Sequence, residues 1–269
     1  MKNLHSSTLT AVLSIAGSDS SGGAGIQADI KTITAHKMYA MTVITALTAQ
    51  NTTGVSSIHN IPPDFVADQI NMVFDDIPPA AVKIGMVSEA PIIMTIAERL
   101  SALHAPHIVL DPVMVSTSGS HLLSPDAIDI LIKNLLPIAE IITPNIPEAE
   151  IIAERSIVSH DDMIKAAANI AKRCSSHTAV LLKGGHLTET ADDLIYCNGE
   201  YQWLYGERVN TNNSHGTGCT LSSAIACGLA DGKSLNAAVS AAKNYVSGAL
   251  NAGLNLGKGN GPLNHMYQL

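Results

Sequence analysis

The sequence predicts one α/β domain with a mainly parallel central sheet that helices cover on both faces. Short apolar runs alternate along the chain with longer amphipathic stretches, which is the pattern of right-handed βαβ units. The length of 269 residues suits one large domain of this class. A hydrophobic content of 46% with only 14% charged residues is typical of a globular chain with a large core. No linker, repeat or low-complexity tract divides the chain, so we expect a single domain over residues 1–269.

The first segment predicts a strand, a loop and a helix. Residues 9–16 form a short apolar run, which is typical of a buried strand. The glycine- and serine-rich residues 17–25 follow as a loop, but they lack the GxGxxG spacing of a dinucleotide-binding turn. Residues 26–36 then predict a helix with an apolar face. Asp29 lies at the edge of that face, so we expect it to be partly buried.

The rest of the chain continues the alternation. Strands are expected over residues 41–49, 80–84, 107–110, 139–142 and 179–182, and helices over 62–74, 91–103, 124–135, 161–173, 218–230 and 234–250. Ser124 precedes a proline and predicts the N-cap of its helix. Residues 191–209 alternate in polarity around Asn198-Gly199, which predicts an antiparallel hairpin.

Charge and composition exclude several classes of function. A net charge of −8 argues against a general nucleic-acid surface or an anionic membrane surface. The N-terminus has no apolar signal core, and no stretch of about eighteen apolar residues could span a bilayer. The four cysteines form no CxxC pair and the eleven histidines form no HExxH motif, so we expect no zinc site. These features predict a cytoplasmic protein with reduced thiols.

The glycine-rich segment 213–220 predicts an anion site. It leads directly into a small, apolar helix, whose first backbone N–H groups have no partner within the helix. Gly216 and Gly218 leave the backbone open to a phosphate. Cys219 falls in the first turn, where a thiol pKa tends to drop. The alternative is a plain glycine turn into a tightly packed helix, and the spacing alone does not decide between the two.

Polar residues end several predicted strands. Asp111, Asn145 and Lys183 follow three of them, and Gln50 follows the strand near the start of the chain. In open parallel sheets ligands bind beyond the carboxyl ends of the strands, so we expect these residues to converge.

Each of these residues also has a structural interpretation. Asn145 and Glu148 have the spacing of a capping box, which the pattern alone favours over the alternative of ordering water around Mg²⁺. Asp111 before a proline fits an ordinary turn or a carboxylate that acts on a metal or on a phosphate-bound water. Lys183 fits a solvated strand end or a positive charge for a transferred phosphoryl group. Two glycine-lysine segments, 228–234 and 253–259, lack the spacing of a P-loop, so a P-loop NTPase is excluded.

Seven segments together resemble a known family. Residues 16–29, 45–52, 83–86, 110–114, 143–149, 182–186 and 215–220 resemble, in this order, the signatures of hydroxymethylpyrimidine/phosphomethylpyrimidine kinases. The likeness extends from about residue 10 to Pro262, which is nearly the whole chain. The resemblance implies the ribokinase-like fold and a place in thiamine biosynthesis. It implies that ATP phosphorylates 4-amino-5-hydroxymethyl-2-methylpyrimidine to the monophosphate and then to the diphosphate, with Mg²⁺, in a homodimer.

The resemblance also implies roles for individual positions. The residues it assigns to the substrate are Gln50, which hydrogen-bonds the pyrimidine, the pocket wall of Gly17, Ala24, Thr48, Met86 and Val113, and Asp29 nearby. Those it assigns to the phosphates and metal are the anion hole Gly216, Thr217, Gly218 and Cys219, the magnesium–water network of Asp111, Asn145 and Glu148, and the lysines Lys183 and Lys258.

One position departs from the wider ribokinase fold. Sugar kinases of that fold have an aspartate as general base where this chain has Cys219. A phosphate acceptor is already ionised, so we expect Cys219 to matter more for the first step than for the second. The hairpin at 191–209 and the loop at 115–121 are candidate lids. Ser120 stands where relatives often have aspartate.

Two other functions remain open. A pyridoxal or pyridoxine kinase would use the same scaffold and glycine motif. A non-catalytic pyrimidine- or nucleotide-binding module would not need the full set of Asp111, Glu148 and Lys183.

Overall fold

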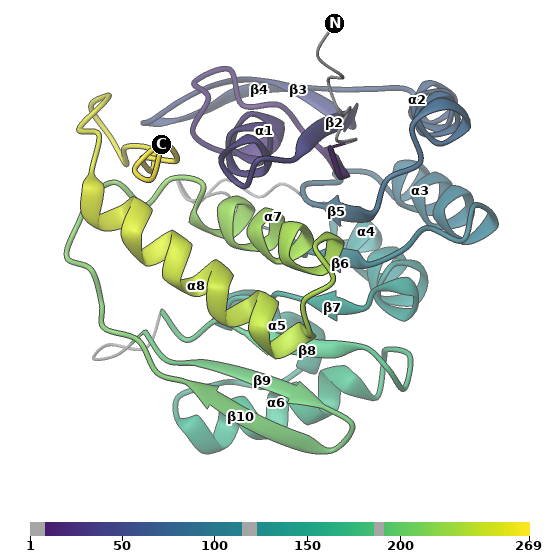
Figure 1. Cartoon of the computed structure of the whole chain (residues 1–269). Helices are drawn as coiled ribbons and strands as arrows, with labels where there is room; N and C mark the ends of the chain where they lie inside the picture. Colours follow the sequence, from purple (N-terminus) through teal and green to yellow (C-terminus); the bar gives the residue numbers. More distant parts are fainter. Residues whose placement is uncertain (1–8, 115–122, 186–190) are drawn as a thin grey trace, which may run out of the picture.

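A computed structural model describes residues 9–114, 123–185 and 191–269 of the chain. Its centre is a single eight-stranded sheet (Figure 1). In spatial order the strands are β10 (Glu200–Leu204), β9 (Asp193–Cys197), β8 (Ala179–Leu182), β7 (Ile141–Ile142), β6 (Ile108–Leu110), β5 (Ala81–Ile84), β1 (Ala11–Ala16) and β2 (Tyr39–Ile44). From β2 to β8 all neighbours pair in parallel, and β9 pairs antiparallel with both β8 and β10. The predicted fold class is confirmed.

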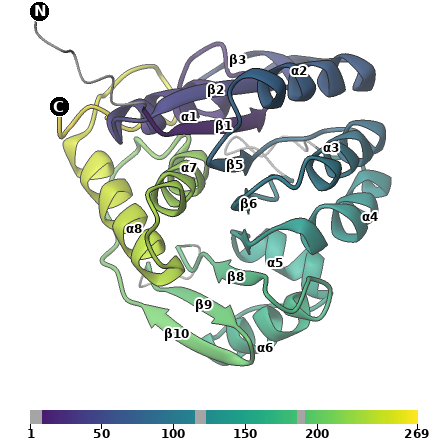
Figure 2. The same cartoon turned by 45° about the vertical axis from the view of Figure 1, so that its right-hand side comes forward.

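Helices cover both faces of this sheet. They are α1 (Gly25–Ala35), α2 (Pro63–Asp76), α3 (Ala90–Ala102), α4 (Pro125–Asn134), α5 (Ile146–Ala153), α6 (His160–Ala171), α7 (Thr217–Ala230) and α8 (Leu235–Ala252), with a short 3₁₀ turn at Leu136–Ile138. Helices α1, α7 and α8 pack on one face, and α2 to α6 pack on the other (Figure 2). The sheet therefore separates two apolar clusters, because alternate strand residues face opposite sides.

The segment after β2 differs from the prediction. Residues 41–49 were expected to form one strand, but the chain leaves the central sheet at Thr45. A separate two-stranded sheet follows, formed by β3 (Ala46–Asn51) and β4 (Gly54–Asn60), and β4 was not predicted. The strand pattern of β4 is obscured in the sequence because most of its residues are polar and exposed.

Local signals in the sequence mark several element ends correctly. The Ser124 side chain accepts a hydrogen bond from the Ala127 N–H, as expected of an N-cap. The hairpin turns at Asn198 and Gly199, which both have positive φ, 52° and 83°. Its strand β9 pairs with β8, so the hairpin extends the central sheet and is not a separate lid. The other candidate lid, residues 115–121 with Ser120, lies outside the described residues.

The carboxyl ends of β1, β5, β6 and β8 meet at one edge of the sheet, since these strands are parallel. The first turn of α7 packs against that edge, above β5 and β6. Among the described residues, no helix combines the length and apolar character that crossing a membrane requires.

Candidate active site

The turn before α7 has the geometry of an anion site. Gly216 is the N-cap of α7 with φ of 88°, and a Cβ there would overlap the carbonyl of Gly23. Only glycine therefore fits both the backbone conformation and the space. The Thr217 hydroxyl donates to the carbonyl of Ser214 at 2.7 Å, and this hydrogen bond holds the turn in place. The first N–H groups of α7 are thus free of side-chain caps and point beyond the helix end.

The same turn meets the ends of two strands. A Cβ built on Gly218 would lie 3.1 Å from Asp111 Oδ2 and 3.4 Å from Lys183 Nζ. Asp111 follows β6 and Lys183 follows β8, and the Lys183 ammonium donates to Asp111 Oδ1 at 3.0 Å. The structure therefore brings a helix N-terminus, a carboxylate and an ammonium group within a few ångströms of one another.

Asn145 and Glu148 form the predicted capping box at the start of α5. Asn145 Oδ1 accepts from the Glu148 N–H, and Glu148 Oε2 accepts from the Asn145 N–H, both at 2.9 Å. Glu148 is nevertheless almost fully buried. Its burial, with the nearby negative charge of Asp111, raises its pKa to about 7, although Lys183 opposes the shift. The structural interpretation is confirmed, and it places an incompletely compensated carboxylate beside Asp111.

This pair of carboxylates fits a hard cation. The described residues contain no group of three or more histidine, cysteine or acidic side chains that would make a protein cage. Mg²⁺ is instead held by one or two carboxylates and keeps several waters. The raised pKa of Glu148 indicates that this edge of the site favours a positive charge.

Cys219 differs from the expectation for a thiol in a first helical turn. Burial raises its pKa to about 11, and the positive charge of Lys83 only partly opposes that shift. Desolvation of the thiol therefore outweighs the effect of the helix terminus on its pKa. Such a thiol is protonated at pH 7, so it can donate a hydrogen bond but is a poor base until a ligand changes its surroundings.

The residues assigned to the pyrimidine lie next to this turn. Thr48 and Gln50 are on the inward face of β3, and the Thr48 hydroxyl lies 2.7 Å from the Ser18 carbonyl and 3.1 Å from Gln50 Oε1. On the other side, a Cβ at Gly17 would lie 3.3 Å from Met86 Sδ, which puts these two residues in contact. β3, the loop after β1 and the loop after β5 thus form one wall.

Asp19 organises the loop after β1, and the sequence analysis did not single it out. Its carboxylate accepts hydrogen bonds from the backbone of Ser21, Gly23 and Ala24 and from the Ser21 hydroxyl. His215 Nε2 lies 2.8 Å from Asp19 Oδ2. Burial alone would raise the pKa of Asp19, but the bonds from His215, Ser21 and Ala24 outweigh it and hold the pKa well below its usual range. The backbone donors follow Asp19 closely in a loop rich in serine and glycine, which is a local pattern, whereas the pairing with His215 joins distant segments and left no signal in the sequence.

The bond to Asp19 also fixes His215 against the substrate wall. His215 Nε2 lies 3.4 Å from Gln50 Nε2. Because Asp19 accepts from Nε2, that nitrogen carries the proton and cannot accept from the Gln50 amide. The Gln50 N–H₂ group therefore keeps donor capacity for another partner.

Asp29 occupies a different environment from the other predicted substrate residues. It is fully buried rather than partly buried, and it pairs with Lys83 at 2.8 Å. Both of its oxygens also accept serine hydroxyls, from Ser14 and Ser223. Its carboxylate is saturated by the protein and does not face the open part of the site. Lys83 stands in a matched signature segment, but a lone lysine in a strand gave no signal of this pairing.

Two further predicted residues lie at the rim. Val113 follows Asp111 and is half-buried. Lys258 is exposed, and its backbone N–H donates to the Thr52 hydroxyl at 3.2 Å. A cavity of about 270 Å³ lies beside this segment; it is lined by Ser21, Gly23, Asn51, Thr52, His215, Leu256, Gly257 and Pro262.

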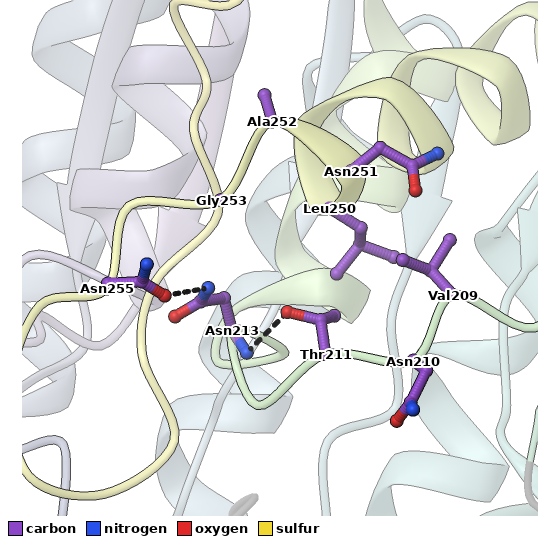
Figure 3. A pocket seen from close by; sticks show the side chains of 9 residues that line it. All are labelled: Val209, Asn210, Thr211, Asn213, Leu250, Asn251, Ala252, Gly253 and Asn255. Atoms are coloured by element: carbon purple, nitrogen blue, oxygen red, sulfur yellow. Dashed lines mark hydrogen bonds between the residues drawn. The ribbon is translucent and has the colours of Figure 1, made fainter.

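A second cavity, of about 320 Å³, is lined by residues from two segments of the chain (Figure 3). It lies between the end of α8 and the segment that leads into the turn, and its lining consists of Val209, Asn210, Thr211, Asn213, Leu250, Asn251, Ala252, Gly253 and Asn255. Asn213 Nδ2 donates to Asn255 Oδ1 at 3.1 Å across it. Because Asn213 is three residues before Gly216, a ligand in this cavity would adjoin the helix N-terminus.

Comparisons with known proteins agree with this site. A family model described as phosphomethylpyrimidine kinase matches residues 19–264. The hydroxymethylpyrimidine/phosphomethylpyrimidine kinase of Rhizobium meliloti is 48% identical over 264 residues, 97% of this chain and 98% of that protein. The thiamine biosynthesis bifunctional protein of Geobacter sulfurreducens is 45% identical over 95% of this chain, but the chain spans only 52% of that protein.

Solved structures give the same result. The crystal structure of phosphomethylpyrimidine kinase from Clostridium difficile has a TM-score of 0.79 and 47% identity, and covers 88% of this chain and 98% of that one. Pyridoxal kinase from Staphylococcus aureus, in complex with AMP-PCP and pyridoxal, has a TM-score of 0.87 and 34% identity over 96% of this chain and 94% of that one. The fold is thus the ribokinase-like one that the resemblance implied. With a family model that covers most of its length, the chain belongs to the phosphomethylpyrimidine kinase family.

Proposed function

We propose that this protein uses ATP to phosphorylate 4-amino-5-hydroxymethyl-2-methylpyrimidine to its monophosphate and then to its diphosphate, in thiamine biosynthesis. The observation that carries the proposal is the meeting of the α7 N-terminus, Lys183 and Asp111 beside the wall that bears Gln50. Phosphoryl transfer depends mainly on positioning and on stabilising negative charge, and this edge offers both.

The pyrimidine is proposed to bind against Gln50, Thr48, Gly17 and Met86, with Ala24 and Val113 completing the wall. The amide of Gln50 offers a donor and an acceptor to ring nitrogens and the amino group. Its donor side is available because the His215 proton is committed to Asp19. The acceptor hydroxymethyl group would then face the anion turn.

The transferred phosphoryl group is proposed to lie on the backbone N–H groups of Gly218 and Cys219. Lys183 is proposed to supply positive charge to this group, because its ammonium lies close to Gly218 and 3.0 Å from Asp111 Oδ1. Asp111, Asn145 and Glu148 would hold Mg²⁺ largely through water, and a bound Mg²⁺ would neutralise phosphate charge. The positive φ of Gly216 and the hydrogen bond of the Thr217 hydroxyl shape the turn. Loss of either would misplace the backbone N–H groups of Gly218 and Cys219.

ATP is proposed to place its base and ribose in the cavity between α8 and residues 209–213 (Figure 3). The cavity combines apolar side chains with several asparagine amides, which suits a purine and a sugar. Its position beside Asn213 directs the phosphates of the nucleotide toward Gly216. Lys258 is proposed to contact the nucleotide from the C-terminal segment.

Cys219 has a limited part in this proposal. The raised pKa makes the thiol a poor base until a ligand changes its surroundings, and only the first acceptor, an alcohol, has a proton for it to take, because the phosphate of the second step is already ionised. Cys219→Ala is therefore expected to slow the first step more than the second. An equal fall in the rates of both phosphorylation steps would contradict a function of Cys219 as a base for the hydroxymethyl acceptor alone.

We also propose a homodimer in the cytoplasm. The outer face of the β3–β4 sheet exposes Leu47 and Ile58, and β2 is an edge strand of the central sheet, so this end of the molecule offers an apolar surface and free backbone groups. All four cysteines are unpaired, as expected in a reducing compartment.

Pyridoxal is the competing substrate. The pyridoxal kinase of Staphylococcus aureus superposes well, with a TM-score of 0.87, but its identity of 34% is below the 48% of the Rhizobium meliloti pyrimidine kinase. The higher identity favours the pyrimidine.

The experiment is ADP release with Mg-ATP, with hydroxymethylpyrimidine, its monophosphate and pyridoxal as separate acceptors and with the products resolved by mass. Diphosphate as the final product from both pyrimidines is the expected result. Turnover of pyridoxal alone would move the function to vitamin B6 salvage. No ADP with any acceptor would favour a non-catalytic binding module.

A further inference from the structure

Lys83 is a fully buried lysine for which the phosphoryl-transfer scheme has no use. It is the third residue of β5, and its side chain has no exposed surface. It cannot touch a substrate, unlike Lys183, whose side chain is 16% exposed. A buried ammonium group is costly unless it is paired and hydrogen-bonded, so its presence requires an explanation.

The pairing of Lys83 is complete. Its ammonium donates to both oxygens of Asp29, at 3.0 and 2.8 Å. Ser14 of β1 and Ser223 of α7 also donate to Asp29, at 2.5 and 2.8 Å. The network therefore ties β1, β5 and α1 to the second turn of α7, the helix whose first turn forms the anion site.

Gly85, which follows β5, leaves the space that the Lys83 ammonium group occupies. A Cβ on Gly85 would lie only 2.6 Å from Lys83 Nζ, so a larger residue would displace the amine. Ser14 is the register partner of Lys83 on β1, and both face the side of the sheet that α7 covers. Gly85 thus allows Nζ to reach the carboxyl edge of the sheet beneath α7.

The charges of the pair have a defined orientation relative to Cys219. Lys83 lowers the pKa of the Cys219 thiol and Asp29 raises it, and the influence of Lys83 is the larger of the two. The contacts agree with this order: Lys83 Nζ reaches Gly85 at the carboxyl edge of the sheet, whereas Asp29 contacts Ser223, one turn further along α7 than Cys219. Asp29 in turn raises the pKa of Lys83 despite its burial, so the lysine remains charged.

We infer that Lys83 is a positioning residue for phosphoryl transfer: held by Asp29 beneath α7, it supplies a fixed positive charge behind Cys219 and the anion turn. In a low-dielectric interior such a charge acts over several ångströms without contact with the ligand. It needs no reorganisation during the reaction, because every hydrogen-bonding partner of Asp29 is already in place. The inference rests on the proposed kinase function for its effect on turnover, but its effect on Cys219 is independent of any substrate.

The test compares three proteins. Lys83→Met with Asp29→Asn removes both charges and retains hydrogen-bonding capacity toward Ser14 and Ser223. Gly85→Ala leaves every charge in place and pushes the amine away. The wild-type protein is the reference, and circular dichroism and thermal unfolding establish that each variant is folded.

Two readouts are needed. The first is the rate at which iodoacetamide alkylates Cys219 at pH 8, followed by peptide mass spectrometry. Cys197 on β9 is the internal control, since it is partly exposed and lies outside this network. The second is the separation of kcat from KM for hydroxymethylpyrimidine and for ATP.

In the double variant we expect Cys219 alkylation and kcat each to fall about tenfold, the effect of one pKa unit. Both KM values and the alkylation of Cys197 should stay within about twofold, because no ligand contact is lost. Gly85→Ala should change both rates in the same direction by a smaller factor. If a folded variant keeps both the wild-type Cys219 rate and the wild-type kcat, the pair is only structural and the inference is wrong. Should the wild-type protein turn over no pyrimidine, the proposed function fails, while the Cys219 rate still tests Lys83.

Discussion

Two lysine–aspartate pairs lie at the same edge of the sheet and are built differently. Lys83 and Asp29 are 2.8 Å apart, and neither side chain has any exposed surface. Lys183 and Asp111 are 3.0 Å apart, but the lysine remains partly exposed. The first pair joins a strand to a helix inside the protein, and the second joins two strand ends that border the site.

The hydrogen bonds explain what this difference means. Asp29 accepts from Lys83 and from two serine hydroxyls, so it has no capacity for a ligand. Asp111 Oδ1 accepts from Thr143 and Lys183, whereas its Oδ2 faces Gly218 and has no hydrogen bond from the residues that the structure describes. A saturated pair gives fixed charge and rigidity, and a partly open pair can exchange its partner for a phosphate or a metal.

The largest expected effect is on stability, from breaking the saturated pair. Asp29→Ala leaves Lys83 charged, buried and without its counter-charge. Removal of one partner from a buried ion pair costs about 3–5 kcal/mol of unfolding free energy. Urea denaturation of the purified variant measures this loss directly.

Asp111→Ala is the matched control for that variant. It frees a lysine that already reaches solvent, and it removes the negative charge that helps to raise the pKa of Glu148. Its loss of unfolding free energy should be smaller than that of Asp29→Ala, because Lys183 is partly exposed and keeps the negative charge of Glu148 nearby. Equal losses in both variants would contradict the distinction between a fixed and an exchangeable pair.

The next effect is on catalysis, from breaking the open pair. Lys183→Ala should lower kcat about 10²–10³-fold, the range for loss of one group that stabilises transition-state charge. Its unfolding free energy should fall less than that of Asp29→Ala, because Glu148, whose pKa is already raised, can take up a proton when the lysine is lost. Steady-state kinetics measure the loss, with the exposed Lys165→Ala as control. A fall in stability without a fall in kcat would mean that Lys183 has only a structural function.

The same contrast shows what the sequence could predict. The central sheet and its helices followed from the periodicity of apolar residues, and the positions of Asp111, Asn145 and Lys183 followed from their places at strand ends. Such features depend on residues close together in the sequence. The capping box of Asn145 and Glu148 is of this kind, and its geometry was predicted correctly.

Contacts between distant segments could not be predicted in this way. Asp19 pairs with His215 and Asp29 with Lys83, across separations of 196 and 54 residues. The partition of residues 39–60 between two sheets was also missed, because a polar, exposed strand such as β4 has no apolar alternation. The fall expected in the pKa of Cys219 was wrong for a similar reason, since burial by the assembled fold reverses the local effect of a helix terminus.

The smallest expected effect is a pH dependence of the Mg²⁺ requirement, which tests whether Glu148 belongs to the part of the site that exchanges ligands. Burial and Asp111 raise the pKa of Glu148 to about 7, so this carboxyl is mostly charged at pH 8 and mostly protonated at pH 6. A cation that binds beside it must displace that proton at the lower pH, and its affinity therefore falls as the pH falls. The Mg²⁺ concentration for half-maximal activity should rise about tenfold from pH 8 to pH 6, which kinetics at saturating ATP and pyrimidine can measure.

Glu148→Gln has no proton to displace, so it should need more Mg²⁺ at both pH values and show little change between them. An unchanged pH dependence in that variant would assign the titration to another group and exclude Glu148 from the part of the site that exchanges ligands.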